Sequence, residues 1–191
     1  MIVGGVELEA EQLAGAEPAL VFLHEGLGSV ALWRDFPARL AAATGRRALV
    51  YSRAGHGQSD VPGGDRTPRF MHDEALDVLP GLLREAGIER PVLVGHSDGG
   101  SIALIHASEH PVDRLILLAP HVFVEDVSVA AIAEARDAFP ALRERMAKHH
   151  RDAERTFGLW NVIWLAPEFR AWNIEDVLPK VTAPALVIQG A

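Results

Sequence analysis

Five short apolar runs, none of which alternates with polar residues, most constrain the fold of this 191-residue chain. They lie at residues 20–23, 48–51, 91–94, 115–118 and 184–188. Strands that are buried on both faces have this pattern, because helices cover both sides of a parallel sheet. The runs therefore predict a sheet of mostly parallel strands inside the protein.

Helical patterns separate the first four runs. They fall at residues 31–43, 70–86 and 100–110, and Gly87 and Pro111 act as stop signals for the last two. Strand and helix in regular alternation predict βαβ units. The expected fold class is α/β, a doubly wound and mostly parallel sheet in a single domain over residues 1–191.

Residues 123–178 interrupt this alternation. They contain no strand pattern, and residues 130–150 have a helical pattern that Pro140 is expected to break or kink. The segment therefore predicts a helical insertion between two strands. Ligands bind at the carboxyl edge of open α/β sheets, so we expect this insertion to form a lid or cap there.

Composition excludes several classes of function. Lys and Arg number 18 against 26 Asp and Glu, a net charge of −8, which disfavours nucleic acid and anionic membranes as partners. There is no cysteine, so disulfides, thiolate metal sites and cysteine nucleophiles are excluded. No apolar run spans a bilayer and no basic, apolar signal begins the chain, so a cytoplasmic location is expected.

Residues 95–99 carry the sharpest chemical signal. They read Gly-His-Ser-Asp-Gly, which matches G-x-S-x-G, between a predicted strand and a predicted helix. The glycines permit the sharp turn that raises the Ser97 hydroxyl to the top of the sheet. The N-terminus of the following helix favours a developing oxyanion. Ser97 is therefore the candidate catalytic nucleophile.

A glycine-rich loop follows the first buried strand. Residues 24–29 read His-Glu-Gly-Leu-Gly-Ser, and a loop of this kind presents backbone N–H groups to an anion. Acyl transfer needs two such donors. We expect the N–H of Asp98 to be one and the N–H of Gly26 or Leu27 to be the other, which makes these residues the candidate oxyanion hole.

These motifs resemble those of the α/β-hydrolase family, and the resemblance extends over essentially the whole chain. Residues 23–26 resemble the family's His-Gly oxyanion loop, with Glu25 where a glycine is usual. Residues 51–59 are similar to its R-G-x-G-x-S turn, with Ala54 inserted, and the turn's expected role is structural. Residues 95–99 resemble the nucleophile elbow. The resemblance implies a serine hydrolase, esterase-like, that cleaves a carboxylic ester or related acyl bond of a small molecule, with no cofactor and no metal.

The resemblance also implies groups that the chain does not contain. Residues 181–190 resemble the strand that ends just before the family's catalytic acid, and the catalytic histidine follows later still. We therefore expect a C-terminally truncated fragment whose acid and base lie beyond residue 191, and which is inactive as it stands. Glu125 or Asp126 is the alternative acid within the chain. His121 is the best placed internal histidine, ahead of His149 and His150, but a pocket-lining or surface position is the preferred interpretation.

Several further residues are expected to line a substrate pocket. For Trp160 and Trp164, packing of the lid onto the core explains the sequence equally well. A non-catalytic ligand-binding module and a carbon–carbon bond hydrolase or lyase of the same family remain alternatives. The H-x-x-E-H pattern at residues 106–110 is interpreted as a helix end and not as a zinc site. The candidate pocket residues are His24, Glu25, His96, His121, Trp160 and Trp164.

Overall fold

A six-stranded sheet forms the centre of the computed structural model, which describes residues 1–190. Its order is β3-β5-β4-β6-β7-β8; β3 is antiparallel to β5 and every other pair is parallel. A separate antiparallel pair, β1–β2, precedes it. The strands are β1 Ile2–Val3, β2 Val6–Glu7, β3 Ala10–Leu13, β4 Ala16–Leu23, β5 Arg46–Tyr51, β6 Val92–His96, β7 Arg114–Leu118 and β8 Ala185–Ile188.

Helices cover both faces of the sheet, which confirms the predicted α/β class. Along β4, Leu20 and Phe22 pack toward the side of α1, whereas Val21 and Leu23 pack toward the side of α3 and α4. This alternation across a strand is what an apolar run buried on both faces requires. The helices are α1 Phe36–Thr44, α2 Phe70–Asp73, α3 Leu79–Glu85, α4 Asp98–Glu109, α5 Asp126–Met146 and α6 Ala153–Leu165.

Two predicted helices are less regular than their sequence patterns. The first begins as a 3-10 turn over Ala31–Trp33, and α1 starts afresh at Phe36 with Pro37 in its first turn, a position where the missing N–H costs nothing. The second is interrupted by a π-helical turn over Glu74–Val78 that joins α2 to α3. Conversely, α5 continues through Pro140 without a break, so the loss of one backbone donor does not end the helix.

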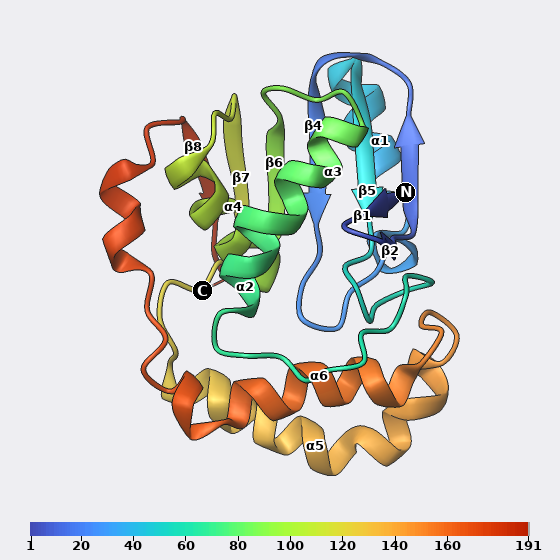
Figure 1. Cartoon of the computed structure of the whole chain (residues 1–191), viewed down its shortest axis with the longest axis vertical. Coiled ribbons are helices and arrows are strands. Elements are labelled where there is room, and N and C mark those ends of the chain that lie inside the picture. The colour runs from blue at the N-terminus through green and yellow to red at the C-terminus, as the bar shows by residue number, and fades with distance from the viewer. Residues whose placement is uncertain (191) are drawn as a thin grey trace.

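Helices α5 and α6 lie side by side along the carboxyl ends of the parallel strands (Figure 1). They belong to residues 123–178, called the helical insertion below. Its two ends meet in a single bridge between Phe123 and Asn173, and the N–H of Ile174 donates to the carbonyl of Val122 at 2.7 Å. Within residues 1–190, none of the helices is both long enough and apolar enough to cross a bilayer.

Candidate functional site

Ser97 lies at the sharp turn between β6 and α4. Its backbone has a φ of 52° and a ψ of −118°, a left-handed conformation that non-glycine residues rarely adopt. The turn is close-packed, because a Cβ at Gly95 would overlap the carbonyl of Gly99, and one at Gly99 would overlap the carbonyl of Leu23. Both flanking glycines are therefore required by close backbone approach, and the strain at Ser97 is held by its surroundings.

His121 lies next to the Ser97 hydroxyl. Its Nε2 atom is 3.0 Å from Ser97 Oγ, within hydrogen-bond distance. His121 lies three residues after the end of β7, and its contact with Ser97 differs from the pocket-lining or surface position that was the preferred interpretation. Ser101, one turn along α4 from Ser97, binds the His121 backbone on both its N–H and its C=O. The i, i+4 spacing of the two serines was the signal that could have pointed to Ser101.

The loop after β4 approaches the elbow from the next strand of the sheet. It turns tightly, since the N–H of Gly28 donates to the carbonyl of Glu25 at 3.1 Å. Gly26 packs against the indole of Trp160, and a Cβ there would overlap the indole nitrogen. Asp98 is the first residue of α4, so its N–H belongs to the donors that a helix leaves unpaired at its start. The candidate oxyanion donors thus come from neighbouring strands, β4 and β6.

Arg53 joins this loop to the elbow. Its Nη2 donates to the carbonyl of Glu25 at 2.8 Å and lies 3.9 Å from the Asp98 carboxylate, and both side chains are almost fully buried. The Arg53 N–H donates to His24 Nε2 at 3.0 Å. Burial and the adjacent guanidinium of Arg53 hold the pKa of His24 well below its usual value. His24 is therefore a neutral interior residue. The contacts of Arg53, which lies in the 51–59 turn, with His24 and Glu25 agree with the structural role predicted for that turn.

Glu25 and His96 form a second, more exposed contact near the site. The His96 Nδ1 atom lies 3.7 Å from a Glu25 oxygen, and the His96 ring packs at the edge of Trp33 with 6.5 Å between the ring centroids. Burial raises the pKa of Glu25, but the contacts with His96 and with its own backbone outweigh burial and lower it overall. Glu25 is thus a carboxylate at neutral pH. It occupies the position where the His-Gly oxyanion loop, which residues 23–26 resemble, usually has glycine.

Helix α6 carries both candidate tryptophans, which pack against His121 and Gly26. Trp164 is 1% exposed, and its ring meets that of His121 edge-on at 5.1 Å between centroids. Trp160 is half-buried and lies against Gly26. The helical insertion therefore covers both His121 and the candidate oxyanion loop. The two indoles make these contacts, so they pack the insertion onto the core and also lie beside the candidate site.

The other predicted residues lie elsewhere. Asp126, the alternative acid, binds Arg170 at the surface, and His150 is buried, where its Nδ1 accepts a hydrogen bond from the Gly57 N–H at 3.0 Å. His106 is nine residues past Ser97, about 13 Å along α4, and its Nδ1 is engaged with the Ala75 carbonyl. Within residues 1–190, no three metal-ligating side chains come together. The acid and base expected beyond residue 191 lie outside the described residues.

Two side chains beside the site, the buried His56 and the half-buried Arg66, were not among the predicted site residues. His56 Nε2 lies 3.0 Å from the Gly26 carbonyl, and an Arg66 nitrogen lies 3.5 Å from the His56 ring. Burial, together with Arg66 and Arg53, lowers the pKa of His56 well below its usual value. His56 lies in a turn whose pattern indicated structure only, and Arg66 lies in a polar loop, so neither carried a motif.

Comparison with known proteins places these features in a family context. A family model described as the alpha/beta hydrolase fold matches residues 18–167. The chain is 35% identical over 103 residues to the sn-1-specific diacylglycerol lipase ABHD11 of Mus musculus, a match that covers 53% of this chain and 32% of that protein. The chain spans about a third of the length of the curated relatives that it matches. The matched region is 32% of this lipase and 39% of a second relative, from Mycobacterium bovis.

Solved structures agree with the fold. An esterase from Exiguobacterium antarcticum superposes with a TM-score of 0.72 at 20% identity, covering 97% of this chain and 78% of that one. The enol-lactonase from Burkholderia xenovorans superposes with a TM-score of 0.72 at 22% identity, covering 99% of this chain and 80% of that one. At such identities the likeness shows a shared fold and leaves the substrate open.

Proposed function

This chain belongs to the α/β-hydrolase fold family, and from that premise we propose that it hydrolyses a carboxylic ester or related acyl bond through Ser97. One observation carries the proposal. Ser97 Oγ lies at a strained strand-to-helix turn and 3.0 Å from the Nε2 atom of His121. A nucleophile held in hydrogen-bond reach of a base is the arrangement that acyl transfer needs.

In the proposed reaction, Ser97 Oγ attacks the carbonyl carbon of the substrate and its proton passes to His121 Nε2. The carbonyl oxygen becomes an oxyanion, which accepts hydrogen bonds from the N–H of Asp98 and from that of Gly26 or Leu27. When the tetrahedral intermediate collapses, the leaving alcohol takes the proton from His121 and an acyl-serine remains. Water then attacks the acyl-serine by the same steps and releases the acid.

The environment of His121 sets the expected rate. Within residues 1–190, no carboxylate is hydrogen-bonded to the His121 imidazole. The hydrogen-bond partner of its Nε2 atom is the Ser97 hydroxyl. A histidine without an orienting acid supports turnover roughly 10⁴-fold more slowly than a complete triad. We therefore expect the chain to acylate at Ser97 but to turn over slowly.

Covalent labelling tests the proposal without requiring turnover. The chain is incubated with a fluorophosphonate, and the modified residue is identified by mass spectrometry alongside hydrolysis of p-nitrophenyl acetate. We expect one adduct, on Ser97, which Ser97→Ala abolishes and which forms at least 10-fold more slowly in His121→Ala, because general-base assistance contributes about 10²–10⁴-fold. Ser108→Ala, on the same helix but hydrogen-bonded only to the Ile105 carbonyl, is the matched control.

Each result has a distinct meaning. An unlabelled Ser97 in a folded chain would overturn the nucleophile and favour a non-catalytic binding protein. Normal labelling in His121→Ala would retain Ser97 and remove His121 from the mechanism.

A further inference from the structure

Arg66 has an unusual setting for a charged side chain. Its guanidinium carbon lies 4.9 Å from the centre of the Phe70 ring. Its Nη2 atom lies 3.5 Å from both nitrogens of His56, a separation too long for a good hydrogen bond. The guanidinium therefore contacts two aromatic rings. Neither ring is the planar oxyanion that a guanidinium binds best, through two parallel N–H groups.

No counter-charge in the described chain satisfies Arg66. Among residues 1–190 it forms no ion pair, and although part of the side chain reaches solvent, its Nη1 atom is buried without a hydrogen-bond acceptor. Burial, with the nearby positive charge of Arg53, lowers the pKa of Arg66 to about 10, so the guanidinium remains charged at neutral pH. Burying part of a charged group without a hydrogen-bond partner is costly, and such groups cluster where ligands bind.

Four charged groups lie close enough to act on Arg66. The groups that act on it are Arg53 and Arg155, which repel it, and Asp98 and Glu74, which attract it. Asp98 lies 3.9 Å from Arg53, and Arg155 binds Asp65 at 2.8 Å, so each is already paired. Glu74 binds the Tyr51 hydroxyl at 2.7 Å, and burial raises its pKa. Arg66 therefore has no ion-pair partner among these groups, although Asp98 and Glu74 attract it from a distance.

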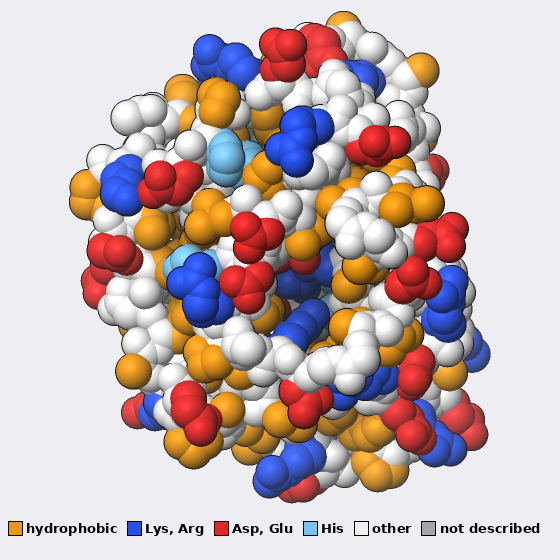
Figure 2. Space-filling view, in the orientation of Figure 1, with side chains coloured by type: hydrophobic (Ala, Val, Ile, Leu, Met, Phe, Trp, Pro, Cys, Tyr) orange, Lys and Arg blue, Asp and Glu red, His pale blue; other side chains and the backbone are white. Residues whose placement is uncertain are grey.

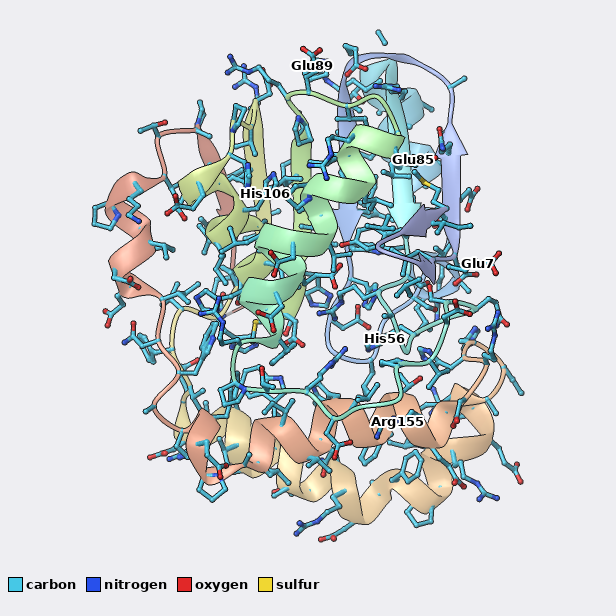
Figure 3. The ribbon with its side chains drawn as sticks, viewed as in Figure 1. Glu7, His56, Glu85, Glu89, His106 and Arg155 are labelled. Atoms are coloured by element: carbon cyan, nitrogen blue, oxygen red, sulfur yellow. The ribbon has the colours of Figure 1, made fainter. Side chains whose placement is uncertain are left out.

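This unpaired charge lies beside the candidate active site. His56, one of the two rings that Arg66 contacts, lies 3.0 Å from the carbonyl of Gly26 in the candidate oxyanion loop. Phe70, the other ring, begins a line of neighbouring rings that continues through Phe169 and Trp164 to His121, the neighbour of Ser97. Figure 3 shows His56 between the sheet and α6. Figure 2 shows this face hollowed at its centre, with Lys or Arg side chains at the bottom of the hollow.

We propose that Arg66 binds a carboxylate of the substrate, so that the acyl compound cleaved at Ser97 is the ester or lactone of an acid with a second, free carboxylate. The proposal rests on the function proposed above and adds the substrate class. A carboxylate accepts two parallel N–H donors from the edge of a guanidinium, and the Nη1 atom of Arg66 has no acceptor among residues 1–190.

Binding to an inactive variant tests the proposal separately from hydrolysis. In Ser97→Ala, calorimetry measures the dissociation constants of monomethyl succinate, monomethyl glutarate and monomethyl adipate, with each dimethyl ester as the neutral counterpart. We expect at least one monoester to bind, and Arg66→Met to weaken it about 10- to 100-fold, as loss of a charge-assisted hydrogen bond does. Binding of the dimethyl ester should not depend on residue 66.

Matched variants exclude a general effect of charge or folding. Arg69→Met removes an exposed arginine from the same segment, where it pairs with Asp73 at 3.5 Å, and should leave binding unchanged. Arg66→Lys keeps the charge but loses the planar donor edge, and an intermediate loss is expected. If Arg66→Met does not fold, Arg66→Lys replaces it as the test. Monoester binding by Arg66→Lys as tight as in the parent chain would then count against the site.

The outcomes separate the two proposals. Equal monoester binding in Arg66→Met and its parent, or no monoester binding in the parent, overturns the carboxylate site and leaves Ser97 labelling unaffected. Arg66-dependent binding in a chain whose Ser97 cannot be labelled supports the anion site and removes the hydrolytic function.

Discussion

Ser101 and His121 hold each other through two hydrogen bonds. The Ser101 hydroxyl donates to the His121 carbonyl at 2.6 Å and accepts from the His121 backbone N–H at 3.2 Å. Ser101 lies on α4 and is fully buried, whereas His121 lies in the connection after β7. The helix that begins at the Ser97 turn therefore also fixes the histidine that faces Ser97.

Removing this hydroxyl should affect both stability and reactivity. Ser101→Ala leaves a buried N–H and C=O of His121 without their partner, which costs about 1–3 kcal/mol of unfolding free energy. We expect fluorophosphonate labelling of Ser97 to slow several-fold as His121 loses its position. Urea unfolding and labelling rates measure the two effects, with Ser108→Ala as control. If labelling stayed fast while stability fell, Ser101 would support the fold without positioning His121.

The close packing at the elbow gives a second test. A Cβ at position 99 would overlap the Leu23 carbonyl, which is backbone and has no room to move. Gly99→Ala should therefore destabilise the chain by several kcal/mol, on the order of the larger effects seen for single substitutions, or prevent folding. Gly158→Ala, in α6 with open space around it, should instead stabilise the helix by about 0.5–1 kcal/mol. Chemical denaturation of both variants checks the contrast, and similar values for the two would refute it.

Buried neutral histidines predict a loss of stability in mild acid. Burial lowers the pKa of His106 to about 4, against its ordinary value of 6.5. Below pH 6.5 the unfolded chain therefore binds a proton that the folded chain does not, so stability falls as the pH drops from 6.5 toward 4. His24 and His56, whose pKa values are also lowered by burial, act in the same direction.

The contribution of His106 can be isolated by substitution. Between pH 7.5 and 5.5 it should cost about 1.4 kcal/mol, since each pH unit corresponds to 1.36 kcal/mol once the unfolded histidine is charged. His106→Gln keeps a donor for the Ala75 carbonyl and has no titration in this range. Urea unfolding at both pH values should show a smaller difference for this variant. An equal difference would mean that His106 does not govern the loss.

The strands and the elbow could be predicted because their signals are local. Each of the five predicted apolar runs contributes to a strand, and Ser97 lies between β6 and α4 as its flanking glycines indicate. Strand β3 was missed because its sequence, Ala-Glu-Gln-Leu, has little intrinsic strand preference and pairs with β5 only in the folded chain. The π-helical turn at Glu74–Val78 likewise has no sequence signal that periodicity would detect.

The site was predictable at its backbone positions and not in its side-chain partners. Ser97 and the glycine loop follow from turn geometry, which the sequence encodes within a few residues. The contact between Ser97 and His121 joins residues 24 positions apart. The contact between Arg66 and His56 depends on how their two loop segments fold against each other. Such partnerships are set by tertiary packing, so no spacing rule indicates them.

The beginning of α6 is anchored to the turn that follows β5. Thr156 Oγ1 donates to the Gly55 carbonyl at 2.6 Å, and the Arg151 N–H donates to the Gly57 carbonyl at 2.7 Å. These bonds attach the start of α6 to the turn after β5. The same turn contributes His56, whose Nε2 atom lies 3.0 Å from the Gly26 carbonyl. One short turn therefore connects the helical insertion to the candidate oxyanion loop, so a change in the sequence of that turn would disturb both at once.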